Sequence, residues 1–166
     1  MALIDGMLQE LEQESQTTRR VLERVPQDQL TWRPHAKSRT LGELALHIAT
    51  VPGAVAELVA SPSPVQAPQF VDPSPKSAAE LVPALDQSIA KAKQVLGGLD
   101  DAALMATWRL MAGDRELLAV PRIGMLRSVM LNHWYHHRGQ LTVYLRELGV
   151  AIPSIYGPSA DENPFA

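Results

Sequence analysis

Three histidines lie in two apolar, helix-periodic stretches of this chain and have the spacing of metal ligands. His133 and His137 are four residues apart in the segment 132–140, and His47 lies far upstream in the segment 44–49. Residues four apart on a helix project from one face, with Cβ atoms about 5–6 Å apart, so one ion can accept a nitrogen from each. If the helix carrying His47 packs alongside, three imidazoles hold one divalent ion and leave a coordination position open, as in catalytic metal sites.

Each histidine also has a simpler interpretation. A single histidine on an apolar face, such as His47, is commonly a hydrogen-bonded core residue. A pair on a core-facing stripe is harder to explain in this way, because two neutral imidazoles lose their hydration on burial. His136 falls on the flank of its helix, where we expect a residue that supports the ligands or faces solvent. His35 has no periodic partner, and we expect it to be exposed.

Residue identities exclude two other classes of helical metal site. Helical zincins need Glu directly after the first histidine, and this position is Trp134. Di-iron bundles need Glu-x-x-His pairs, and no histidine here has Glu three residues before it. An all-histidine site for a divalent metal remains; zinc suits it best, and nickel, cobalt and manganese stay open. A fourth ligand, from His136 or from the Asp161–Glu162 pair, would make the site structural instead.

Two polar residues follow the histidines on the same stretch. Arg138 and Gln140 could orient a substrate or a histidine ring, as residues behind metal ligands often do. A solvated helix face explains both residues equally well.

The elements that must position the histidines are predicted to be four amphipathic helices. Apolar residues recur at three- and four-residue steps over about 3–25, 40–58, 77–96 and 121–148. The apolar stripe of the first helix thins between Leu11 and Thr18. Thr40 with Glu43 predicts a capping box at the second helix, and Pro52 is expected to kink or end that helix.

The connections complete a fold prediction of an all-α four-helix bundle with one long crossover. Five prolines between 61 and 75 predict a long loop, which we call the strap. Residues 104–120 predict a short β-hairpin or an irregular excursion around a Gly-Asp turn. Residues 151–166 form a tail without periodicity, and the whole chain, 1–166, is expected to be a single domain.

Composition restricts the partners. The chain has 166 residues, a net charge of −3, 46% hydrophobic residues and no cysteine. Arginines are scattered rather than clustered, which argues against nucleic acid as a partner. No apolar run reaches the roughly 18 uncharged residues of a membrane span, and the start lacks signal-peptide features. We therefore expect no membrane partner and a cytoplasmic location, and any thiol chemistry needs a thiol from outside the chain.

Several segments together resemble the DinB-like superfamily, which includes bacillithiol- and mycothiol-dependent transferases and isomerases. The resemblance is carried by residues 32–34, 38–47, 133–140, 145–149 and 153–162, of which the last contains Tyr-Gly-Pro-Ser. It implies a four-helix bundle, often a homodimer, with a divalent metal held by His47, His133 and His137. Most members of the family have no established reaction, and the family name implies no DNA binding.

The preferred hypothesis is a metal-dependent transferase or isomerase that uses a low-molecular-weight thiol to attack a small electrophile. A divalent ion that binds the sulfur favours the reactive thiolate. Two alternatives stay open. One is a metal-dependent hydrolase with the same ligands, and the other is a non-enzymatic, stress-associated bundle whose ion fastens two helices.

Overall fold

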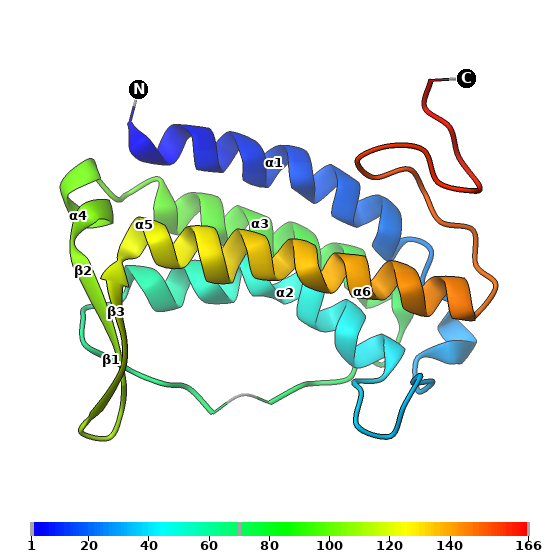
Figure 1. Ribbon diagram of the computed structural model, residues 1–166, viewed down its shortest axis with the longest axis horizontal. Coiled ribbons are helices and arrows are strands. Elements are labelled where there is room, and N and C mark those ends of the chain that lie inside the picture. The colour runs from blue at the N-terminus through cyan, green and yellow to red at the C-terminus, as the bar shows by residue number, and fades with distance from the viewer. Residues whose placement is uncertain (1, 70, 166) are drawn as a thin grey trace.

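The computed structural model describes residues 2–69 and 71–165, and four long helical segments dominate it (Figure 1). They are α1 (Leu3–Leu22), α2 (Leu41–Ala60), α3 (Leu81–Leu96) and a continuous run of α5 (Arg122–Met125), the π-helical η3 (Leu126–Asn132) and α6 (His133–Glu147). The first and last segments run in one direction, and α2 and α3 run in the other (Figure 1). The predicted all-α four-helix bundle is confirmed.

The helices meet along apolar stripes that form one core. Leu11 of α1, Ile48 of α2, Leu85 of α3 and Leu141 of α6 are all at most 1% exposed. Burying a side chain of this kind stabilises a fold by about 1.5–3 kcal/mol. The core therefore holds the faces of α2 and α6 at close range, and these two helices carry the three histidines.

One turn of α1 carries buried polar side chains instead of apolar ones, and these side chains bind an arginine of α6. Glu14, Ser15 and Thr18 are buried there. Arg138 is only 1% exposed; its guanidinium lies 2.6 Å from the Glu14 carboxylate and donates to Thr18 Oγ1 at 3.1 Å. The interpretation of Arg138 as part of a solvated helix face is wrong, since its side chain is buried and pairs with α1.

Pro52 does not end α2, which continues to Ala60. The proline has no N–H, so the carbonyl oxygen of Ile48 loses its helical donor. The indole Nε1–H of Trp134 in α6 donates to this oxygen at 2.8 Å. Of the two expected outcomes, a kink or an end of the helix, the end is wrong. The freed carbonyl instead accepts a hydrogen bond that joins the two helices carrying the histidines.

One residue beyond Pro52, the backbone of α2 is hydrogen-bonded to α3. The Gly53 N–H donates to Ser88 Oγ at 2.8 Å, and the Ser88 hydroxyl donates to the carbonyl of Thr50 at 3.1 Å. A Cβ at Gly53 would lie 2.9 Å from the Ser88 carbonyl oxygen, so the close approach of the two backbones requires glycine here. At the start of α2, Thr40 and Glu43 form the predicted capping box.

The strap leads from α2 to α3 along the outside of the bundle, which confirms the long crossover (Figure 1). It contains β1 (Val65–Gln66), which sequence patterning did not predict, and it is followed by η2 (Ala78–Glu80). β1 pairs in parallel with β2 (Thr107–Ala112), and β2 pairs antiparallel with β3 (Arg115–Pro121). Gly113, with φ of 60°, makes the hairpin turn, so the predicted excursion is a hairpin.

The remaining segments are short or irregular. η1 (Gln27–Gln29) follows α1, which ends about one turn earlier than predicted, and α4 (Asp101–Met105) precedes β2. The C-terminal tail is held by ion pairs of Asp161 with Arg146 and of Glu162 with Arg20. By length and composition α2 could cross a membrane, but half of its most apolar window is buried inside the bundle, as expected of a core helix.

Candidate metal centre

The structure brings His47, His133 and His137 together at one point between α2 and α6. Their ring centroids are separated by 5.4 Å (47 to 133), 4.7 Å (47 to 137) and 4.3 Å (133 to 137). One ring nitrogen from each lies within 4.8 Å of those of the other two. His133 begins α6 directly after the π-helical turn, and His137 follows one helical turn later. The convergence expected from the spacing is therefore present.

The hydrogen bond from Trp134 to Ile48 fixes the relative position of these rings. Ile48 directly follows His47, and Trp134 directly follows His133, so the bond lies next to the centre on both helices. Both Trp134 and Ile48 are fully buried. A shift of α6 along α2 would break this bond and leave a buried carbonyl unpaired, which costs about 1–3 kcal/mol.

The spacing of the ring nitrogens is close to that of ligands around one divalent ion. Nε2 of His47 and Nε2 of His133 are 3.1 Å apart. Two nitrogens bound to one zinc at about 2.0–2.1 Å in tetrahedral geometry lie about 3.4 Å apart. The same distance also suits one Nε2–H donating to the other nitrogen, as in a histidine pair without an ion. The residues fit a metal with three nitrogen ligands, and the identity of that metal is open.

Gln140 fixes the orientation of the third ring. Its Oε1 lies 2.6 Å from Nδ1 of His137. Because an amide oxygen only accepts, Nδ1 carries the hydrogen and Nε2 keeps its lone pair for a ligand bond. One of the two roles considered for Gln140 from the sequence, orienting a histidine ring, matches this contact.

All three rings are held in the neutral state that metal binding requires. Burial lowers the pKa of His47 to about 4, and the positive charge of Arg39 adds to this effect. Burial also lowers the pKa of His137 to about 4, although the hydrogen bond to Gln140 opposes the shift. The pKa of His133 is lowered as well, by burial and then by Arg39. Near pH 7 each ring therefore offers a lone pair rather than a positive charge.

An ion pair from the strap lies beside the centre. Arg39, just before α2, pairs with Asp72 of the strap at 2.9 Å, and Asp72 Oδ1 is 4.0 Å from Nδ1 of His47. Sequence reasoning missed both residues, because neither belongs to a periodic pattern. One signal was available: Asp72 is the lone charged residue between 61 and 75.

Within the described residues, the cluster of metal-binding side chains consists of these three histidines. His136 is exposed, with its ring 5.1 Å from that of His137, and His35 is exposed too, as expected. Asp161 and Glu162 are engaged by Arg146 and Arg20 in the tail. The fourth ligands considered from the sequence therefore do not join the cluster, which offers three nitrogen ligands.

Two cavities adjoin the centre. A cavity of about 460 Å³ contains His47 and His133 in its wall and is otherwise mainly apolar. A second cavity, of about 430 Å³, is lined by His137 together with Lys37, Arg39 and Asp72. The histidines lie where two chemically different spaces meet.

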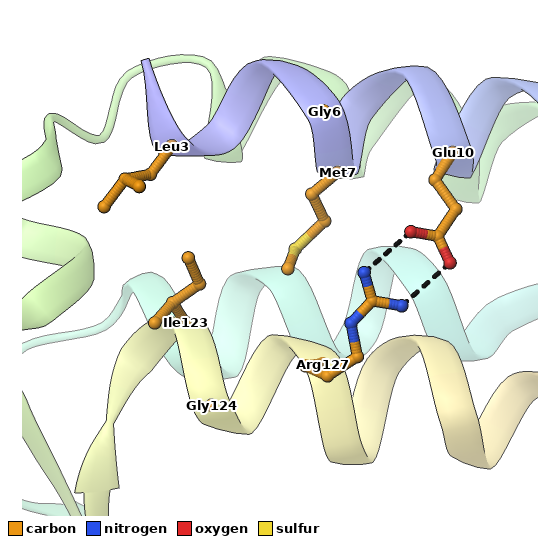
Figure 2. Close-up of a pocket in the computed structure, with 7 residues that line it drawn as sticks. All are labelled: Leu3, Gly6, Met7, Glu10, Ile123, Gly124 and Arg127. Carbon is orange, nitrogen blue, oxygen red and sulfur yellow. Dashed lines mark hydrogen bonds and ion pairs between the residues drawn. The ribbon is translucent and has the colours of Figure 1, made fainter. Parts of the chain in front are cut away.

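A third hollow lies elsewhere and contains no histidine. About 570 Å³ in volume, it is bounded by α1 and the start of the last helical segment, and Figure 2 shows Leu3, Met7 and Ile123 along it. The Arg127 guanidinium binds the Glu10 carboxylate through two nitrogens, at 2.8 and 2.7 Å (Figure 2). These residues are salt-bridged or apolar and offer no reactive group, so the histidine centre is the stronger candidate for chemistry.

Nearly the whole chain is similar in sequence to known proteins. A model of the DinB family matches residues 2–164. The uncharacterized protein YrdA of Bacillus subtilis (strain 168) is 27% identical over 162 residues, covering 96% of this chain and 91% of that protein.

Two crystal structures show the same fold. A DinB-like protein from Bacillus cereus ATCC 10987 superposes with a TM-score of 0.71 at 25% identity, covering 92% of this chain and 97% of that one. The DinB-like protein YjoA of Bacillus subtilis gives a TM-score of 0.66 at 22% identity, covering 97% of both chains.

Proposed function

The chain belongs to the DinB family, and on that premise we propose that it is a divalent-metal-dependent transferase or isomerase in which a low-molecular-weight thiol attacks a small electrophile. One observation carries the proposal: three neutral imidazole nitrogens lie within 4.8 Å of one another, with no fourth metal-binding side chain among the described residues in the cluster. Structural zinc sites usually close with four protein ligands, whereas catalytic sites keep a position open.

His47, His133 and His137 would hold the ion, and zinc is the metal we propose first. A divalent ion there would favour the thiolate form of a thiol that reaches it. The protein's own contribution is positional. Gln140 keeps the lone pair of His137 Nε2 directed at the centre, and the Trp134–Ile48 hydrogen bond keeps α2 and α6 in register.

The chain contains no cysteine, so the sulfur must come from a co-substrate. With an alkyl or aryl halide, the thiol loses its proton to solvent and its sulfur forms a bond to carbon. The halide leaves with the electron pair of the broken carbon–halogen bond. The two cavities give such a pair of reactants separate approaches to one point. We also propose a cytoplasmic location, because low-molecular-weight thiols are kept reduced there.

The test is a thiol-consumption assay on zinc-loaded protein with an aryl halide and a panel of thiols that includes bacillithiol and mycothiol. We expect loss of free thiol and formation of the thioether, both abolished in the His137→Ala variant and retained in His136→Ala. Loss of the electrophile without thiol consumption would instead identify a hydrolase. Stoichiometric metal without either reaction would identify a non-enzymatic metal-binding protein.

A further inference from the structure

The two cavities beside the histidines differ in the chemistry of their walls. The apolar wall of the cavity of about 460 Å³ comes from Val51, Val55 and Leu58 of α2, Val129 of η3, and Pro68 and Val71 of the strap. Glu57 also lines this cavity, and its carboxylate is paired with Lys91. Its volume is within the range of small-molecule pockets, about 300–1,000 Å³, which are predominantly apolar. This space suits the uncharged carbon body of a small molecule.

The cavity of about 430 Å³ is polar and carries an excess of positive charge. Lys37 and Arg39 lie on it, with Asp72 as the acidic residue among its lining side chains. Gln140 and Tyr144 of α6 line the side that carries His137. Two cations against one carboxylate leave a net positive wall, which favours an anionic guest.

Arg39 already shows how a carboxylate is bound here. One of its terminal nitrogens lies 2.9 Å from Asp72, while its Nε is buried and without a hydrogen-bond partner among the described residues. A guanidinium offers five N–H donors, so Asp72 leaves donors free. The side chain of Arg39 is 30% exposed, so a donor that Asp72 does not use can bind an incoming carboxylate through a charge-assisted hydrogen bond.

We propose that the two cavities divide the reactants. A thiol that also carries a carboxylate binds on Arg39 and Lys37 in the polar cavity, and an apolar electrophile binds in the other, with the histidines between them. The proposal rests on thiol transfer as the function and adds which class of thiol is used. Asp72 occupies part of Arg39 and thereby competes with the carboxylate of the thiol.

The test measures thiol binding directly. Cobalt-substituted protein is titrated with N-acetylcysteine and with N-acetylcysteine amide, which differ only in the carboxylate, and the sulfur-to-cobalt charge-transfer absorption is followed. We expect wild type to bind the acid at least about tenfold more tightly than the amide, as a charge-assisted hydrogen bond predicts.

Two variants distinguish recognition of the thiol carboxylate from anchoring of the strap. Arg39→Gln and Asp72→Asn both remove the Arg39–Asp72 ion pair, but only Arg39→Gln also removes the proposed carboxylate-binding group. We expect Arg39→Gln to abolish the preference for the acid and Asp72→Asn to increase it several-fold. A purely structural role of the pair would move both variants in the same direction and would overturn the proposal. Cobalt content, measured in parallel, shows that the histidine centre is intact in each variant.

The apolar cavity is tested with Val55→Phe, which reduces its volume at a half-buried position. We expect thiol affinity to be unchanged, while KM for a bulky apolar halide rises about tenfold. Equal binding of acid and amide to wild type would reject the division of reactants and leave thiol transfer standing. No charge-transfer band with either thiol would reject both.

Discussion

At the scale of single residues, the two nitrogens of the His137 ring have different tasks. Nδ1 is engaged by Gln140 at 2.6 Å, and only Nε2 remains to bind an ion. Replacing Gln140 with Ala frees the ring to rotate and to change tautomer, and the loss of such a partner typically costs 10–100-fold in metal affinity. We expect that loss in a zinc titration against a chromogenic chelator. Gln140→Glu keeps an acceptor at the same place and should retain the affinity; equal weakening in both variants would mean that the contact does not orient the ring.

The three ligands themselves are separable from their neighbour His136. Replacing His47, His133 or His137 with Ala should abolish stoichiometric metal in protein purified without an affinity tag or chelator, as measured by elemental analysis. His136→Ala serves as the matched control, because His136 adjoins His137 in sequence but is exposed and outside the cluster. Full occupancy in any of the three variants, or loss in His136→Ala, would contradict the assignment.

The pH dependence of metal binding follows from the lowered pKa values of the histidines. Protons compete with a metal only when they bind the ligand, and the pKa of His47 and of His137 is about 4 rather than 6.5. Affinity should therefore stay nearly constant from pH 8 to about pH 6 and fall steeply as the pH approaches 4. A fall that is already half complete at pH 6.5, in calorimetric titrations with cobalt, would show that the rings titrate as exposed histidines do.

Acid should also destabilise the metal-free protein. Groups with a folded pKa below the unfolded value bind more protons when unfolded, so the stability they contribute is present above about pH 6.5 and is lost as pH falls toward 4. Urea denaturation between these pH values measures the effect. Replacement of all three histidines by Asn should remove this part of the slope.

At the scale of elements, the positions of the histidines depend on a hydrogen bond that α2 lacks at Pro52 and that a side chain of α6 replaces. Pro52 frees the Ile48 carbonyl, and Trp134 donates to it at 2.8 Å. Trp134→Phe should destabilise the metal-free protein by about 1–3 kcal/mol, because a buried carbonyl is left unpaired. In a Pro52→Ala background the N–H of residue 52 satisfies Ile48, so the same tryptophan change should cost at least about 1 kcal/mol less. Additivity of the two changes within about 0.5 kcal/mol in urea denaturation would rule out this coupling.

The hydrogen bond at Pro52 also distinguishes what could be predicted from the sequence from what could not. The four helices and the facing pair His133 and His137 followed from three- and four-residue spacing, which reports the side of a helix that is buried. The expected end of α2 at Pro52 was wrong, because spacing does not reveal that Trp134 on another helix donates to the freed carbonyl. Arg39 and Asp72 were missed for the same reason: their pairing is set by the path of the strap, which has no periodicity.

At the scale of the whole molecule, one buried ion pair joins the first helix, the last helix and the C-terminal tail. Arg138 of α6 pairs with Glu14 of α1, and both side chains are at most 10% exposed. The Tyr156 ring of the tail lies 5.2 Å from the guanidinium, and its hydroxyl donates to Glu14 at 2.9 Å. The Tyr135 ring lies at the same distance, 5.2 Å, from the guanidinium. The homodimer that the family resemblance implies stays a prediction.

Arg138 follows His137 directly in the sequence, yet its side chain serves the bundle rather than the metal. Arg138→Met should therefore lower the free energy of unfolding by about 3–5 kcal/mol, since it leaves the buried Glu14 without its cation. Adding Glu14→Leu removes the stranded charge and should recover most of that loss, as measured by urea denaturation. Below their unfolding transitions, both variants should still bind one equivalent of zinc with unchanged affinity. A loss of zinc from folded Arg138→Met protein would mean that the pair orients the neighbouring histidine after all, and the separation between scaffold and centre would not hold.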